Sequence, residues 1–173
     1  PPVVPELDGD LVLALDAVQD PGNVGTIIRT AAWFGVRTIL LGSGSADPFS
    51  PKVIRSTQGA IFSVNVRAGV ELAQEVRKAR SGGWRVLATM LSERADSLFE
   101  TPVLGPMMIV LGSEAHGVSR AVVEACDGTL FIPRYGEGES LNVAASAAIT
   151  LAEFRRQQVE AYRATSANIG GAA

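Results

Sequence analysis

Short apolar segments recur from one end of the chain to the other, separated by longer stretches in which apolar and polar positions are mixed. Most of these segments are rich in valine, isoleucine and leucine and are apolar on consecutive positions, as is typical of strands buried on both faces of a sheet. We therefore predict strands at residues 11–18, 38–42, 62–66, 85–90, 107–112 and 129–133.

The stretches between these segments have the periodicity of helices. We predict helices at about 23–34, 50–58, 69–81, 119–126 and 142–163. In the last and longest of them, apolar residues at three- and four-residue spacings, such as Ala144, Ala147, Leu151 and Phe154, give the helix one apolar side. Strands that alternate with helices predict an α/β fold with a mostly parallel sheet and helices on both faces.

The two ends of the chain lack these patterns. Pro1, Pro2 and Pro5 lie close together with acidic residues, so residues 1–10 are interpreted as an extended linker. Residues 164–173 are small and polar and are expected to form a disordered tail. A length of 173 residues suits one domain, which we expect at residues 11–163.

One segment, IPRYGEGESLNVAAS at residues 132–146, has the character of a ligand-binding loop. It follows a predicted strand, and Gly136 and Gly138 permit backbone conformations that other residues avoid. Ser140 or Asn142 can then cap the long helix, whose first N–H groups have no partner within the helix. Taken alone, the segment fits an ordinary strand-to-helix connection equally well.

Two further segments of similar character follow predicted strands, DPGNVGTIIRTAAWFG at 20–35 and MIVLGSEAHG at 108–117. Together they contain Asn23 with Arg29 six positions on, and Gly112-Ser113-Glu114 with Gly117. With Ser140-Leu141-Asn142, these residues resemble the three ordered motifs of the SpoU (TrmH-like) family of RNA ribose 2′-O-methyltransferases in the SPOUT superfamily. The resemblance covers the chain from about Leu11 to Gln157. It implies a C-terminal trefoil knot, which no periodicity in the sequence indicates.

The resemblance also implies an activity, the transfer of a methyl group from S-adenosylmethionine to a ribose 2′-hydroxyl without a metal. By their positions in the motifs, Gly112, Ile132 and Leu141 correspond to donor-binding residues, although Ile132 and Leu141 on pattern alone would be core residues. We add the neighbouring Leu111, Ser113, Pro133 and Gly136 to this donor-binding set, and we assign catalytic roles to Asn23, Arg29, Glu114, Ser140 and Asn142.

Arg29 is the side chain on which we expect catalysis to depend most. A guanidinium is effectively always protonated, so we expect Arg29 to hold a substrate phosphate and the developing alkoxide, while the proton passes to phosphate or water. We expect Gly25 to let the backbone of the same segment approach a ligand, and Glu114 to orient Asn23 or pair with Arg29. His116, the only histidine, occupies a variable position of the family, and we do not expect it to be catalytic.

The charge balance restricts how the chain could bind RNA. Fifteen basic and 18 acidic residues give a net charge of −3, whereas proteins that bind nucleic acid through bulk electrostatics usually have a basic excess. RNA contacts must therefore be local, and Arg29, Lys52, Arg55 and Arg134 are the candidates. Arg134 stands where many members of the family have methionine. Members of the family often carry a small N-terminal RNA-binding domain, and we expect one to be missing from this chain.

No apolar run reaches the roughly 20 residues of a membrane-spanning helix, so we expect a soluble, cytoplasmic protein without a membrane partner. The family resemblance implies a homodimer that acts on RNA, and the GESLNVAAS sequence slightly favours ribosomal over transfer RNA. Two alternatives remain open, a catalytically idle RNA-binding relative and a dinucleotide-dependent oxidoreductase. The second is weakened because DPGNVG, and no G-x-G-x-x-G, follows the first strand.

Overall fold

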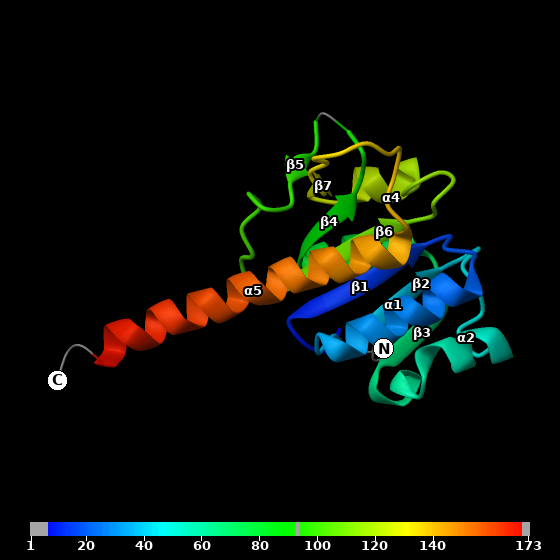
Figure 1. Cartoon of the computed structure of the whole chain (residues 1–173), viewed down its shortest axis with the longest axis horizontal. Coiled ribbons are helices and arrows are strands. Elements are labelled where there is room, and N and C mark those ends of the chain that lie inside the picture. Colours follow the sequence, from blue (N-terminus) through cyan, green and yellow to red (C-terminus); the bar gives the residue numbers. More distant parts are fainter. Residues whose placement is uncertain (1–6, 93, 171–173) are drawn as a thin grey trace.

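A seven-stranded sheet forms the centre of the protein, with strand order β3-β2-β1-β6-β4-β7-β5 (Figure 1). The computed structural model describes residues 7–92 and 94–170, and of residues 165–170 only the backbone. The strands are β1 (Leu11–Asp16), β2 (Thr38–Gly42), β3 (Asn65–Val70), β4 (Arg85–Thr89), β5 (Asp96–Ser97), β6 (Met107–Gly112) and β7 (Gly128–Phe131).

Every pair of neighbouring strands in this sheet is parallel, which confirms the predicted fold class. The pairing of β1 with β6 is in register over its whole length, from Leu11 opposite Met107 to Asp16 opposite Gly112. The carboxyl ends of the strands therefore meet at one edge, where loops can build a site.

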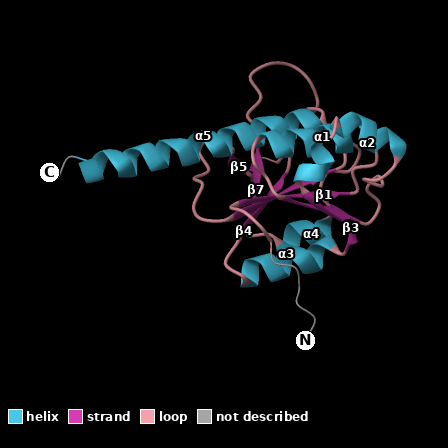
Figure 2. Ribbon diagram, turned by 90° about the horizontal axis from the view of Figure 1, so that it is seen from below, coloured by secondary structure: helices cyan, strands magenta, loops and turns pink. Residues whose placement is uncertain are grey.

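Helices cover both faces of the sheet (Figure 2). On one face lie α1 (Pro21–Trp33), α2 (Pro51–Thr57) and α5 (Val143–Gly170), and on the other α3 (Leu72–Ser81) and α4 (Arg120–Ala125). Two hydrophobic clusters fill the layers, one that includes Ile27, Leu151 and Phe154, and a second that includes Val76 and Val122. The buried strand segments are apolar on consecutive positions because each faces both clusters.

The two edges of the sheet differ from the predicted strands. Residues Ala60–Ser63 form a short 3-10 helix, so β3 begins at Asn65 and not at residue 62. The strand β5 has two residues and was not predicted. Both lie at an edge of the sheet, where a strand is less fully covered and need not be apolar.

Helix α5 is longer than the sequence pattern indicated. It continues to Gly170, so residues 164–170, which were expected to be disordered, are helical, while residues 171–173 lie outside the described part. Between Val143 and Ile169 no glycine or proline interrupts the helix, and alanine favours it. The C-terminal half of α5 extends beyond the sheet (Figure 1).

Arg155 fastens α5 to the rest of the domain. Its guanidinium donates from Nε to the carbonyl of Phe34 at 2.7 Å and from Nη1 to Asp10 Oδ2 at 2.7 Å. The hydrogen bond from Arg155 holds the pKa of Asp10 below its ordinary value of 3.8, although partial burial of the carboxyl acts in the opposite direction. Residues 7–10 have no regular secondary structure, and residues 1–6 lie outside the described part, so the linker stays a prediction.

In the described part of the chain, no helix combines the length and the apolar character needed to cross a lipid bilayer. The predicted knot stays a prediction.

Candidate active site

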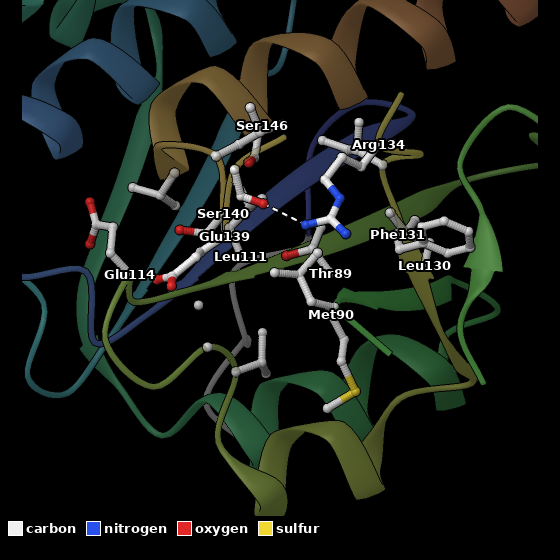
Figure 3. Close-up of a pocket in the computed structure, with 18 of the residues that line it drawn as sticks. Thr89, Met90, Leu111, Glu114, Leu130, Phe131, Arg134, Glu139, Ser140 and Ser146 are labelled. Carbon is white, nitrogen blue, oxygen red and sulfur yellow. Dashed lines mark hydrogen bonds between the residues drawn. The ribbon is translucent and has the colours of Figure 1, made fainter. Parts of the chain in front are cut away.

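A cavity of about 610 Å³ opens at the carboxyl ends of β4, β6 and β7 (Figure 3). Its wall comes from the end of β4 at Thr89, from the loop that follows β6 and from the loop between β7 and α5, with Val143 and Ser146 of α5. The volume lies within the range of about 300–1,000 Å³ that is usual for small-molecule sites. Three loops far apart in sequence thus enclose one binding space.

The loop after β6 is packed so tightly that residue 112 must be glycine. A Cβ atom on Gly112 would lie 2.0 Å from the carbonyl carbon of Gly117 and 2.1 Å from the backbone nitrogen of Val118. The loop closes on itself because Gly117 donates its N–H to the carbonyl of Ser113 at 2.8 Å. The buried carboxylate of Asp16, at the end of β1, accepts the N–H of Ser119 at 2.7 Å and anchors the far end of the loop.

A chain of amide and carboxylate side chains lies beside the cavity. Asn23 donates from Nδ2 to Oε1 of Glu114, which lines the cavity, and Asn142 donates from Nδ2 to Oδ1 of Asn23 at 3.0 Å. Asn142 Oδ1 in turn accepts the N–H groups of Ala144 and Ala145 at 2.9 and 3.2 Å and so caps α5. These contacts join the first turn of α1, the loop after β6 and the loop before α5.

Asn23 is held in place by the start of α1. Asp20 caps this helix by accepting the Asn23 N–H at 2.8 Å, and Pro21 occupies the first turn. The expectation for Gly25 was wrong, because this residue is buried against α2 and no ligand could approach it. A Cβ atom there would lie 2.4 Å from Cβ of Ser56 and 2.8 Å from the carbonyl oxygen of Val53.

Acidic groups dominate the charge around the cavity. Glu114, Glu137 and Glu139 line it together with one arginine, Arg134. The Arg134 guanidinium turns back onto its own loop, which also carries Glu139, and Nη1 donates to the carbonyl of Gly138 at 2.5 Å (Figure 3). This arrangement favours a ligand with positive charge and disfavours a phosphate. Within the described residues, no group of three or more His, Cys, Asp or Glu side chains could hold a metal ion.

A sequence model of one family, described as the SpoU rRNA Methylase family, matches residues 10–152. The chain belongs to this family. It is 42% identical over 83% of its length to the 23S rRNA (guanosine(2553)-2′-O)-methyltransferase RlmP of Bacillus subtilis, and it covers 57% of that protein. The chain spans less than two thirds of the length of the first curated relatives that it matches.

Solved structures of SpoU proteins have the same fold. A TrmH-family protein from Porphyromonas gingivalis superposes with a TM-score of 0.81 at 43% identity, over 90% of this chain and 63% of that one. The SpoU methyltransferase AviRb of Streptomyces viridochromogenes, in complex with the cofactor AdoMet, superposes with a TM-score of 0.79 at 31% identity, over 90% of this chain and 63% of that one.

The predicted SpoU site residues fall into three groups. The predicted donor-binding residues all lie in the wall of the cavity: Leu111, Gly112, Ser113, Ile132, Pro133, Gly136 and Leu141. Glu114, Ser140, Arg134 and His116 also line it. Asn23 and Asn142 do not line the cavity but are joined to Glu114 by hydrogen bonds. Arg29, Lys52 and Arg55 lie outside it, exposed on α1 and α2.

Sequence reasoning missed the part of the SpoU cavity that β4 provides. Thr89, Met90 and Leu91 line the cavity at the end of this strand. The strand itself was predicted, and β4 lies between β6 and β7 in the sheet, whose ends carry the predicted residues. The sequence pattern does not reveal the order of the strands, so it could not show that the end of β4 lies beside the predicted residues.

Proposed function

We propose that this chain is the catalytic part of an RNA ribose 2′-O-methyltransferase that uses S-adenosylmethionine. One observation carries the proposal: Asn23, Glu114 and Asn142, from three separate motifs, are hydrogen-bonded to one another beside a cavity of small-molecule size. Two of its relatives, the 23S rRNA methyltransferase RlmP and the SpoU methyltransferase AviRb, add support.

The cavity fits the proposed methyl donor in both size and charge. Leu111, Leu130 and Ile132 offer apolar surface for an adenine ring, and Glu114 and Glu139 offer negative charge to the donor's sulfonium and amino groups. S-adenosylmethionine, when bound, supplies an electrophilic methyl group on a positively charged sulfur. The chain's own residues bind it and exclude water from the walls of the cavity.

The polar chain holds Glu114 in a fixed position. Because Asn142 is itself fixed by the start of α5, it fixes Asn23, which in turn holds one oxygen of the Glu114 carboxylate. The second carboxylate oxygen is left to accept a hydrogen bond from a substrate hydroxyl. We assign Glu114 and Ser140 to orienting the ribose, since both border the cavity, and Asn23 and Asn142 to positioning Glu114.

Arg29 is assigned to the substrate side of the reaction. It is exposed, and within the described residues it makes no hydrogen bond or ion pair, so its five donors are available to RNA. It does not line the cavity, and its proposed contact is therefore with a phosphate of the bound RNA, held so that this phosphate or a water takes the proton of the ribose hydroxyl as the methyl group leaves the donor sulfur for the ribose oxygen.

We further propose a homodimer that acts on ribosomal RNA in the cytoplasm. The described part of α5 leaves Val159 48% exposed on a segment that extends beyond the sheet, and Trp33 at the end of α1 is 86% exposed. Large exposed apolar residues on neighbouring helices suit a subunit interface. The ribosomal target follows the name of RlmP and the GESLNVAAS motif.

Two binding titrations and one assay test this function. We expect calorimetry to detect binding of S-adenosylmethionine and none of NAD, which separates methyl transfer from the dinucleotide alternative. Incubation of a 23S rRNA transcript with methyl-labelled donor should then place label in RNA that resists alkaline cleavage at the modified ribose. A protein that binds donor and RNA but transfers no label would be the catalytically idle relative.

A further inference from the structure

Phe49 is a large apolar side chain that a rigid turn keeps exposed to solvent. It is 65% exposed and lies in the connection between β2 and α2, flanked by Pro48 and Pro51. Asp47 accepts the Phe49 N–H on Oδ1 at 2.9 Å and the Ser50 N–H on its carbonyl at 3.1 Å. Two prolines and a hydrogen-bonded turn leave the backbone of Phe49 little freedom to withdraw the ring from solvent.

The turn is fastened to the loop that begins the active site. Ala46 donates its N–H to the carbonyl of Val18 at 2.9 Å, just after β1. Lys52 forms an ion pair of 3.9 Å with Asp20, the residue that caps α1 and accepts the N–H of Asn23. Phe49 therefore lies at the carboxyl edge of the sheet, on the α2 side of the polar chain that borders the cavity.

Cationic side chains gather on this side of the site. Lys52 and Arg55 are exposed on α2, three residues apart. Arg29 follows Gly25 by one helical turn, and Gly25 packs on Val53 and Ser56, so Arg29 lies on the side of α1 that faces α2. The cavity wall on the other side carries Glu137 and Glu139. An RNA backbone is thus attracted to the ridge of α1 and α2 and repelled from the loop after β7.

We propose that Phe49 stacks on a base of the RNA substrate next to the nucleotide that is methylated, while Lys52 and Arg55 hold the adjoining phosphates. This inference rests on the proposed function. Proteins recognise single-stranded RNA by combining a positively charged groove with aromatic rings on which unstacked bases lie. Phe49 is bordered by charged and polar groups, as a stacking platform is, and a protein-docking patch would be continuously apolar.

Three variants of Phe49, one control and one phosphate-contact variant test the stacking role. Phe49→Ala removes the ring, Phe49→Leu keeps apolar volume without a π face, and Phe49→Trp enlarges the π face. Phe62→Ala is the matched control. Phe62 is 90% exposed but lies in the 3-10 helix before β3, at the amino end of that strand, whereas Phe49 lies at the carboxyl ends of the strands. Lys52→Ala serves as a phosphate-contact variant.

The binding probes are a fluorescein-labelled oligoadenylate and an oligomer of the same length without bases. We expect Phe49→Ala and Phe49→Leu to bind oligoadenylate roughly 5- to 20-fold more weakly, Phe49→Trp to bind it at least as well as wild type, and Phe62→Ala to be unchanged. Binding of the abasic oligomer and the salt dependence should stay as in wild type for all Phe49 variants. Lys52→Ala should instead reduce the slope of log affinity against log salt by about 0.7.

Methylation of a 23S rRNA transcript provides the second readout. Phe49→Ala should raise KM for RNA, retain kcat at saturating RNA and leave donor binding unchanged. Equal affinity of wild type and Phe49→Ala for oligoadenylate would overturn the inference, and so would a change in light-scattering mass, which would assign Phe49 to a subunit interface. If wild type itself binds no S-adenosylmethionine and methylates no transcript, the proposed function fails, a result distinct from an unchanged Phe49→Ala in an active enzyme.

Discussion

Gly112 is the residue at which the smallest chemical change should have the largest effect on donor binding. Because a Cβ atom there would overlap the backbone of Gly117 and Val118, even Gly112→Ala forces the loop after β6 to move. We expect this variant to bind S-adenosylmethionine at least about tenfold more weakly and to lose roughly 1–3 kcal/mol in the free energy of unfolding, as in overpacked cores. Calorimetry and urea denaturation measure the two effects.

Gly136 provides the matched control for this prediction. It lines the same cavity, but a Cβ atom there would meet nothing within 4 Å. We therefore expect Gly136→Ala to fold as wild type does and to keep the same free energy of unfolding. If Gly112→Ala bound the donor as tightly as Gly136→Ala does, the loop after β6 would have no part in the donor site.

Arg29 should separate catalysis from donor binding. We expect Arg29→Ala to lower kcat for RNA methylation by roughly 100-fold or more, the usual effect of removing a group that stabilises a developing oxyanion, and to leave donor affinity unchanged. Arg29→Lys should not restore activity, because an ammonium lacks the planar fork of the guanidinium. Single-turnover methylation at saturating donor is the measurement.

Arg77 offers the corresponding control, since it is exposed on α3, on the opposite face of the sheet. Arg77→Ala should methylate at the wild-type rate. Near wild-type turnover in Arg29→Ala would remove Arg29 from the mechanism.

Candidate site residues could be selected from the sequence where they follow a strand or precede a helix. Gly112 follows an apolar strand and Asn142 precedes a long helix, and the structure brings both to the same edge of the sheet. Gly25 shows the limit of such reasoning. A glycine that admits a ligand and a glycine that admits a neighbouring helix look the same in sequence, and only the position of α2 distinguishes them.

Among the elements, the start of α5 links folding to chemistry through Asn142. The side-chain oxygen Oδ1 of Asn142 caps the helix, and the side-chain nitrogen Nδ2 donates a hydrogen bond to Asn23. Asn142→Ala should lose about 1 kcal/mol of stability together with activity, whereas Asn142→Asp keeps an acceptor for the cap but cannot donate to Asn23. We expect Asn142→Asp to be nearly as stable as wild type and as inactive as Asn142→Ala.

Thermal denaturation and the methylation assay, run on both variants, test this separation. Recovery of activity in Asn142→Asp would mean that the cap alone matters and that the hydrogen bond to Asn23 does not position Glu114.

The attachment of α5 through Arg155 predicts a pH-dependent contribution to stability. Because the hydrogen bond from Arg155 lowers the pKa of Asp10 in the folded protein, the pair stabilises the fold at pH values above about 3.8, the ordinary value, and stops doing so as pH falls through the lowered one. The Asp10 side chain is 53% exposed, so solvent screening limits the contribution to roughly 0.5–1 kcal/mol.

Asp10→Asn tests this contribution. The variant should unfold at lower urea concentration than wild type at pH 7, and the difference should shrink as pH falls below about 3.8. A difference that stays constant down to about pH 2.5 would assign the effect to a group other than the Asp10 carboxylate.

The elements themselves were predictable where they are buried. The five inner strands were found from their sequences, but β3 was displaced and β5 was missed. Burial requires inner strands to be apolar, whereas residues such as Asn65 and Arg67 at an edge can be polar. The end of α5 was misjudged because small residues are compatible with both helix and disorder.

At the scale of the whole molecule, we expect light scattering at low micromolar concentration to give about twice the chain mass of 18.1 kDa. An obligate dimer commonly buries roughly 2,000 Å² or more of largely apolar surface. Trp33→Glu, a substitution at an exposed position, should weaken the dimer if α1 contributes to it, while Phe62→Glu serves as a comparison at another exposed aromatic residue. A monomer with full donor binding and RNA activity would contradict the proposal.

Properties of the whole molecule were the least accessible from sequence. The predicted order of strands and helices limits the fold to the α/β class, but the predicted knot would depend on how one loop passes another, and the proposed RNA target would depend on the shape of a surface. Lys52, Arg55 and Arg134 were all equally plausible RNA contacts in sequence. Only the structure shows that Lys52 and Arg55 are an exposed pair on α2, whereas Arg134 lies in the wall of the cavity.

The position of β1 at the centre of the sheet determines the order in which a growing polypeptide can assemble. Its neighbour β2 follows soon after it, but its other neighbour, β6, begins at Met107, and the partner of Asn23, Asn142 just before α5, lies 119 positions away. During synthesis the backbone groups on one side of β1 therefore stay unpaired until β6 has been made, and in this state they are prone to pair with other chains. Such distant pairings also make folding slow. The polar chain beside the cavity closes last, when α5 reaches it.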